Sequence, residues 1–194
     1  MLRRILDRTL ILFLSRGFHR VNTDEIAQSV GISKRTLYRY YSSKEKLISA
    51  VIDHFKAKMR GRIDEVLART DLVAMERFQM VITHVAEMIS RISPDLMLDL
   101  ERERPDIFQD MMTFRASNIR SLAGVLREAQ KQGAIDPRVD VDFAIDMLLA
   151  SINGLLNPKY LMAHSISFDQ GLAKIHAIFL QGIETRAKTG RTSK

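Results

Sequence analysis

The segment TDEIAQSVGISKRTLYRYYSSKEKL, residues 23–47, contains two short stretches with the helical spacing of apolar residues, separated by Gly31. The first stretch predicts a helix over residues 23–30, with Thr23 as its N-terminal cap. Gly31 permits a tight turn, and Ser33 caps a second predicted helix that ends at residue 40. Two short helices joined by such a turn have the spacing of a helix-turn-helix.

The second predicted helix has one apolar face and one polar face. Ile32 and Leu37 supply the apolar contacts that hold it across the first helix, where the small Ala27 allows close approach. The outward face combines hydrogen-bond donors with methyl and aromatic groups, which suits the major groove of DNA. The residues on this face are Lys34, Arg35, Thr36, Tyr38 and Arg39.

Positive charge is concentrated in the first third of the chain. Residues 1–60 contain 13 Lys and Arg against 5 Asp and Glu, a net charge of +8, whereas the whole chain of 194 residues carries +7. This asymmetry indicates an N-terminal module that meets a polyanion and a C-terminal module with another task. A solvated basic face without a partner is the alternative, and charge alone does not separate the two.

Composition points to a globular protein of the cytoplasm. A hydrophobic content of 46% is enough to build a core, and the absence of Cys excludes disulfides and thiolate chemistry. The apolar run at residues 10–14 is too short for a signal peptide, and no run reaches the roughly 18 apolar residues that a membrane span needs. We therefore expect cytoplasmic localisation and no membrane partner.

Helical periodicity extends over nearly all of the remaining chain, and no segment shows the sustained alternation of a strand. Gly17, Pro94, Pro105 and the QGAIDP segment at 132–137 separate the helices. The sequence therefore predicts an all-α fold with a disordered tail at residues 189–194. Further helices are predicted over residues 2–16, 44–68, 72–91, 94–103, 105–132, 139–164 and 168–187.

No combination of residues indicates catalysis or a cofactor, so we expect a protein that is not an enzyme. The chain contains no nucleophile elbow, no Gly-rich phosphate loop and no HExxH motif. Its histidines lack the paired i, i+4 spacing of metal ligands, so no metal site is expected. They are His19, His54, His84, His164 and His176.

Residues 5–47, ILDRTLILFLSRGFHRVNTDEIAQSVGISKRTLYRYYSSKEKL, resemble the DNA-binding domain of the TetR (tetracycline repressor) family of bacterial regulators. The resemblance covers the first three helices and the start of the fourth, while the C-terminal half shares only the architecture of the family. Its most specific features are the helix end from Phe13 to Gly17-Phe18, Thr23 with Ile26-Ala27, Gly31-Ile32-Ser33, and Leu37-Tyr38 with Tyr41 and Lys44-Glu45.

The resemblance implies a helix-turn-helix DNA-binding domain over residues 1–45 and a helical effector-binding and dimerisation domain over residues 46–188. It implies phosphate contacts for Thr23, Tyr38, Tyr40 and Lys44, and base contacts for Lys34, Arg35 and Thr36, with Ser33 at the start of the same helix. Thr23 could instead serve only as a cap, and Lys44 could lie in solvent. Arg35 stands where many relatives have a small residue, so no relative's operator can be transferred.

In the resembled family the last two helices of each subunit form a four-helix dimer interface. The segments 143–156 and 172–183 are apolar over more than one face, which a helix covering only its own core does not need. We therefore expect a homodimer, although two buried helices in a monomer would give the same pattern. The predicted interface residues are Leu148, Ile152, Leu155, Ile175 and Phe179.

Methionine and phenylalanine side chains between residues 72 and 147 predict an effector pocket, because Met fills irregular apolar space. Ordinary core packing is the more frequent explanation for any one of them. An acidic cluster at residues 95–110 surrounds them, and a carboxylate turned inward would favour a lipophilic cation. We therefore expect a mostly apolar effector, with a cationic one slightly preferred. The candidate residues are Phe78, Met88, Met97, Met111, Phe114 and Met147.

Together these features predict a ligand-responsive DNA-binding transcriptional regulator, a homodimeric repressor that a small hydrophobic effector releases from double-stranded operator DNA. Ligand and operator would prefer different separations of the two DNA-binding heads, with the helix at 44–68 carrying the motion. A transcriptional activator and a helical adaptor that no longer reads DNA are the alternatives. The adaptor predicts loss of Lys34, Arg35, Tyr38 or Lys44, and all four are present.

Overall fold

The computed structural model describes residues 1–185, and over this range the chain forms eleven helices and no strand. The predicted all-α fold is confirmed, while the predicted disordered tail at 189–194 lies outside the described residues. None of the helices in residues 1–185 is long and apolar enough to cross a membrane. The helices are α1 (Leu2–Arg16), α2 (Thr23–Val30), α3 (Lys34–Tyr40), α4 (Lys44–Leu67), α5 (Ala74–Ile89), α6 (Pro94–Glu103), α7 (Pro105–Ser121), α8 (Ala123–Lys131), α9 (Val141–Leu155), α10 (Pro158–Ala163) and α11 (Phe168–Ile183).

Two of the predicted helices are each divided in two. The predicted helix over 105–132 is divided at Leu122 into α7 and α8, and the one over 139–164 is divided into α9 and α10. The second break follows from Pro158, which favours an extended backbone at Asn157 and occupies the first position of α10. Asn157 also caps α10 with its side chain, so the Asn-Pro pair is the sequence signal for this break.

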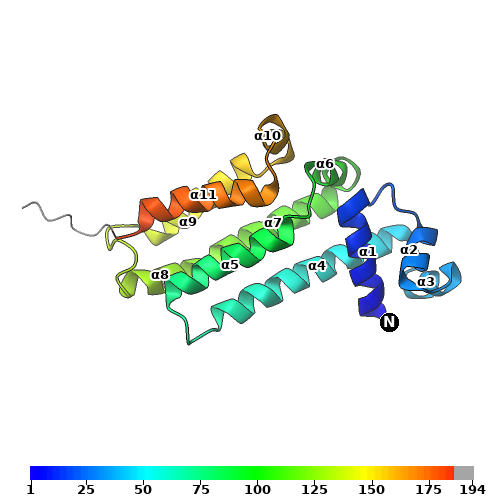
Figure 1. Cartoon of the computed structure of the whole chain (residues 1–194), viewed down its shortest axis with the longest axis horizontal. Helices are drawn as coiled ribbons and strands as arrows, with labels where there is room; N and C mark the ends of the chain where they lie inside the picture. Colours follow the sequence, from blue (N-terminus) through cyan, green and yellow to red (C-terminus); the bar gives the residue numbers. More distant parts are fainter. Residues whose placement is uncertain (186–194) are drawn as a thin grey trace, which may run out of the picture.

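The helices form a small head at one end of a longer helical body (Figure 1). The head consists of α1, α2 and α3, and α4 runs from the head along the body, where it packs on α5 and α7. α9 and α11 pack on each other and cover the side of the body that faces away from α4. The head therefore lies far from the outer faces of α9 and α11.

Two apolar clusters hold these parts together, and α4 contributes side chains to both. Its first turns supply Leu47 and Val51 to the cluster inside the head, and the next turn supplies Phe55 to the cluster inside the body. Leu100 of α6 also belongs to the head cluster. Head packing thus continues beyond residue 45, and the domain boundary predicted there stays a prediction.

The helix-turn-helix begins with a different cap from the predicted one. Asn22, and not Thr23, caps α2, because the Glu25 N–H donates to Asn22 Oδ1 at 2.9 Å. In return the Asn22 N–H donates to Glu25 Oε2 at 3.1 Å. This reciprocal pair is a capping box, and its Asn-x-x-Glu spacing is the signal that identifies the cap in the sequence.

The turn between α2 and α3 forms as predicted. Gly31 adopts φ 75° and ψ 40°, a left-handed conformation that side chains with a Cβ disfavour. Ser33 caps α3, since its Oγ accepts from the Thr36 N–H at 3.1 Å. Local chemistry therefore accounts for where both helices begin and where α2 ends.

We expect Asn22→Ala to lower the free energy of unfolding by about 1 kcal/mol, because the α2 N-terminus loses its cap. Urea unfolding followed by circular dichroism measures this loss. Asn22→Ser is the matched control and should retain most of the stability, because its hydroxyl can accept from the same N–H. Equal losses in the two variants would contradict the capping role.

Candidate nucleic-acid interface

α3 presents a basic and aromatic surface on the outside of the head. Leu37 is almost fully buried and anchors α3 in the head cluster. Around it Arg35, Tyr38, Arg39 and Tyr40 are exposed. Their guanidinium and phenol groups can donate to phosphate oxygens or base edges. The exposed side of α3 therefore has the chemistry of a DNA-reading helix.

The three residues predicted to contact bases differ in whether their side chains already contact other residues of this chain. Lys34 Nζ donates to Asp24 Oδ2 at 2.8 Å, and this hydrogen bond raises the pKa of Lys34. Thr36 Oγ1 lies 2.9 Å from Ser33 Oγ, so both hydroxyls serve the start of α3. Arg35 has no side-chain hydrogen bond or ion pair within residues 1–185. Its guanidinium can therefore turn to a base edge without breaking another contact.

The residues predicted to contact phosphates lie in α2, α3 and the start of α4. Thr23 is the first residue of α2 and Lys44 the first residue of α4, and both are partly exposed. Lys44 Nζ lies 3.4 Å from the His19 carbonyl oxygen, to which it donates, and so does not extend freely into solvent. None of the eight residues predicted to contact DNA is buried. Their roles at DNA stay predictions.

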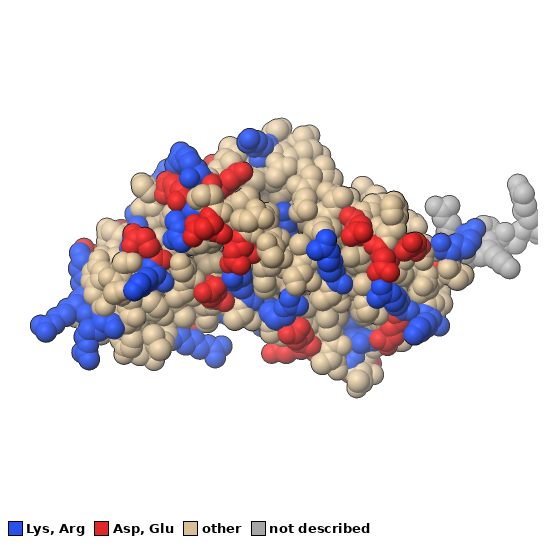
Figure 2. Space-filling view, turned by 180° about the vertical axis from the view of Figure 1, so that it is seen from behind, with Lys and Arg blue, Asp and Glu red and all other residues tan. Residues whose placement is uncertain are grey.

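The predicted site omits basic residues of α1 and of the turn that follows it. Arg3, Arg4, Arg8 and Arg20 are exposed, and Arg4 Nη2 lies 3.5 Å from the position that a Cβ on Gly31 would take. Figure 2 shows Lys and Arg side chains gathered at the head end, whereas both signs of charge alternate along the body. The excess of positive charge in residues 1–60 is the sequence signal for this surface.

Residues 5–51, from α1 to the first turns of α4, match the family described as bacterial regulatory proteins, tetR family. Residues 5–51 therefore form a DNA-binding domain of the TetR family. It is 27% identical to YvaF of Bacillus subtilis (strain 168), an uncharacterized HTH-type transcriptional regulator, over 93% of this chain and 94% of that protein. This domain and the likeness to YvaF over nearly the whole chain identify a DNA-binding transcriptional regulator and not an enzyme, as predicted.

Solved structures share the whole fold. A transcriptional regulator from Cytophaga hutchinsonii ATCC 33406 matches with a TM-score of 0.75 and 19% identity, over 95% of this chain and 98% of that chain. A regulator from Saccharomonospora viridis, in complex with choline, matches with a TM-score of 0.67 and 21% identity, over 95% and 97%. At these identities the likeness concerns the fold alone.

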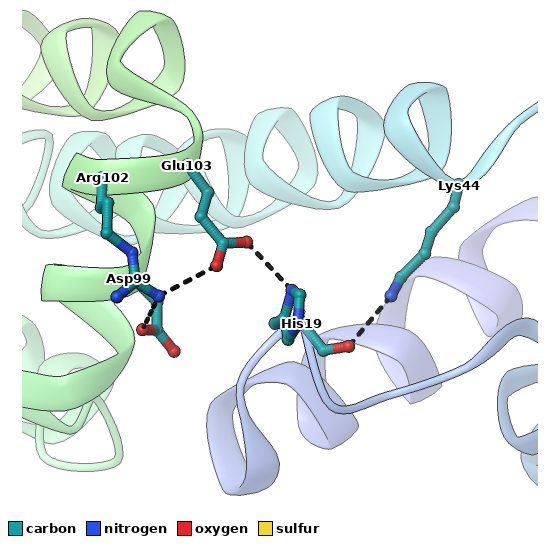
Figure 3. A network of polar contacts seen from close by, with 5 residues as sticks. All are labelled: His19, Lys44, Asp99, Arg102 and Glu103. Atoms are coloured by element: carbon teal, nitrogen blue, oxygen red, sulfur yellow. Dashed lines mark hydrogen bonds and ion pairs between the residues drawn. The ribbon is translucent and has the colours of Figure 1, made fainter.

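A polar network connects the head to α6 (Figure 3). His19 Nδ1, in the turn after α1, lies 3.1 Å from Glu103 Oε2, and the His19 carbonyl accepts from Lys44. Arg102 donates to both Asp99 and Glu103. Because these groups are largely exposed, the network adds little stability, but it restrains the head turn against the end of α6.

An apolar cavity of about 130 Å³ lies inside the body, with walls from α4, α5, α6, α7, α9 and α11. Met97, Met111 and Phe114 of the predicted effector residues line it. The other three predicted residues do not line this cavity. Phe78 is fully buried elsewhere in the body core, Met88 lines a surface groove beside α1 and α4, and Met147 is exposed on α9.

The predicted interface residues also need correction. Leu148, Ile152, Ile175 and Phe179 are buried within the chain itself, and Leu155 alone is exposed. The outer face of α9 and α11 presents other large apolar side chains, with Phe143 70% and Ile178 73% exposed, together with Met147. Since both helices are apolar on two faces, their sequence does not reveal which face turns inward.

The acidic cluster at residues 95–110 does not reach the cavity. No Asp or Glu lines it, and Asp99, Glu103, Asp106 and Asp110 of the cluster form ion pairs with Lys or Arg outside the cavity instead. Because no carboxylate turns into the cavity, the structure does not support the predicted preference for a cationic effector. Within residues 1–185 no group of three or more His, Asp and Glu side chains is arranged to hold a metal ion.

Arg35→Ala should cost about 1 to 3 kcal/mol of binding at the native operator and relax the preference at one base position per half-site. The reason is the loss of a bidentate donor to guanine. Fluorescence anisotropy with operator and scrambled duplexes measures both effects.

Lys44→Ala is the contrast for that measurement. It should weaken binding to both duplexes alike and reduce the slope of log K against log salt by about one, because a phosphate contact is lost. Base contact by Arg35 is contradicted if Arg35→Ala gives equal losses on operator and scrambled DNA.

Proposed function

We propose that this TetR-family regulator is a homodimeric repressor whose heads bind operator DNA and whose body releases that DNA when it binds a small hydrophobic effector. The position of α6 carries the proposal. Met97 of α6 lines the cavity, and Leu100 of the same helix packs in the head cluster. A ligand that displaces Met97 therefore acts on a helix against which the head packs.

α4 forms a second connection between cavity and head. Phe55 lines the cavity, and Val51, one turn earlier, packs in the head cluster. Because α4 is one continuous helix, a shift at Phe55 is transmitted to the head. Operator half-sites place two recognition helices about 34 to 36 Å apart. An effector that favours another separation weakens DNA binding, and DNA weakens effector binding by the same factor.

The outer face of α9 and α11 supports the homodimer. Exposed Phe143, Met147 and Ile178 form an apolar surface that water disfavours. Gly154 and Gly182 have no neighbouring atom within 4 Å of the position of a Cβ, so a partner helix can approach closely there. Leu155, the exposed member of the interface residues predicted from the sequence, is also part of the proposed interface.

The remaining alternatives concern the sign of regulation and the loss of DNA reading. An activator would use the same head and the same cavity. A helical adaptor is less well supported, because Arg35, Tyr38 and Tyr40 are exposed and able to donate. We also infer a cytoplasmic location, since bacterial operator DNA lies there. The choline of the Saccharomonospora viridis regulator is not transferred, because no carboxylate lines the cavity here.

The test begins with selection of an operator from random duplex DNA by the full chain. We expect a site with two related half-sites. Matched anionic, neutral and cationic hydrophobes are then added to the complex, and a promoter reporter measures the sign of regulation. Release by a hydrophobe with a rise in transcription supports the proposal. Release by polar metabolites or metal ions alone would sink it.

Ile178→Glu should convert the dimer to monomers that bind a two-half-site operator far more weakly, because it places a charge in the apolar interface. Sedimentation velocity measures the oligomeric state. Gln79→Glu is the matched control, since it adds the same charge on the exposed face of α5. An Ile178→Glu protein that still sediments as a dimer would locate the interface elsewhere.

A further inference from the structure

An open pocket of about 490 Å³, more polar than the apolar cavity of the body, adjoins that cavity. The two spaces share wall residues Met97, Met112, Arg115 and Leu156. The inner cavity is almost wholly apolar, whereas the outer pocket has polar and basic side chains. No Asp or Glu lines either space. The outer polar residues are Gln109, Thr113, Arg120, Asn153 and Asn157.

Arg115 stands where the two spaces meet and has no counter-ion. Its Nη2 donates to Asn153 Oδ1 at 2.8 Å and lies 2.9 Å from Met112 Sδ, both of which are uncharged. Its Nε is buried without a hydrogen-bond partner, and within residues 1–185 it forms no ion pair. Burial lowers the pKa of Arg115. Arg115 is partly buried, and a partly buried guanidinium without an anion is unfavourable, so this position favours a negatively charged ligand.

Asn118 adds a second unsatisfied group to the same wall. It lies three residues after Arg115 on α7, so the two side chains project from neighbouring positions of the helix. Asn118 is only 7% exposed, and both its Oδ1 and its Nδ2 lack partners among the described residues. Buried amide groups are normally hydrogen-bonded. An amide donor beside a guanidinium matches the two oxygens of a carboxylate.

We propose that this site binds an amphipathic monoanion, a short aliphatic or aromatic carboxylate whose carboxylate contacts Arg115 and Asn118. The apolar part of the ligand fills the inner cavity, and the outer pocket provides access for it from solvent. The inference rests on the proposed function, because it names the chemical class of the effector. A cationic hydrophobe finds no carboxylate here and is repelled by Arg115.

The volume of the inner cavity limits the size of the ligand. An apolar cavity of about 150 Å³ accommodates benzene, so one of about 130 Å³ suits an apolar part of about six carbons. Longer chains require Met97, Met111 and Met112 to change rotamer, which flexible methionines permit. Hexanoate and phenylacetate are therefore suitable probes.

The first experiment compares ligands that differ only in charge. Isothermal titration calorimetry with the full chain uses hexanoate, hexan-1-ol and hexylamine, and in parallel phenylacetate, 2-phenylethanol and 2-phenylethylamine. We expect each carboxylate to bind at least about tenfold more tightly than its alcohol, and the amines not to bind, because only the carboxylate forms a charge-assisted hydrogen bond with Arg115. Alcohols or amines that bind as tightly as the carboxylates would overturn the proposal, as would no binding of either carboxylate.

The second experiment changes the wall of the site. Arg115→Gln should weaken carboxylate binding at least about tenfold and leave alcohol binding nearly unchanged, and Arg115→Lys should lie between. Arg62→Gln, an exposed site on α4 away from both pockets, is the matched control and should bind like the parent protein. Equal losses for carboxylate and alcohol would contradict a charge contact.

Asn118→Leu tests the site independently of Arg115. If Asn118 serves the ligand, its replacement should raise the melting temperature of the ligand-free protein, since an unpartnered buried amide is removed, and weaken carboxylate binding. A lower melting temperature with unchanged binding would overturn the role of Asn118. This readout stays informative even if the Arg115 variants fold poorly.

Operator binding is measured separately, so the two proposals can fail separately. If carboxylates bind in a manner that depends on Arg115 but leave operator affinity unchanged, the result supports the inference and contradicts effector release. Operator release by alcohols or amines, without carboxylate binding, would overturn the inference and leave the proposed regulator intact.

Discussion

The structure depends above all on the burial of one continuous side of α4. Leu47 and Val51 at its start belong to the head cluster, and Phe55 and Ile63 further along belong to the body cluster. α4 is one continuous helix, so a displacement of its body part is carried toward the head. The packing of the body and the position of the head are therefore linked through α4.

α6 makes this dependence specific to the cavity. Met97 of this helix lines the cavity, and Leu100, about one turn later, belongs to the head cluster. Glu103, after one further turn, takes part in the polar network. The helix also packs on α7 and α10. The head and the cavity thus share α6 as a common wall.

The cavity wall on α7 departs from the rule that buried polar groups are satisfied. Arg115 Nε and both amide atoms of Asn118 have no hydrogen-bond partner, although mostly apolar side chains line the same cavity wall. Two such groups on adjacent turns of one helix lower stability without any gain within the chain. Departures of this kind concentrate at functional sites, where a ligand supplies the missing partner.

The sequence by itself determined the helices, the helix-turn-helix and the basic head, because caps, turns and charge act between residues close along the chain. Asn22, Gly31 and Ser33 are examples. The Asn22 capping box is visible in the sequence as well, although the sequence-based prediction placed the cap at Thr23. Tertiary structure alone decided that Met97 lines the cavity while Met147 faces outward, and that Leu148 is core while Ile178 is surface. Helices that are apolar on two faces carry no periodic signal for the inward one, so only packing against distant segments could select it.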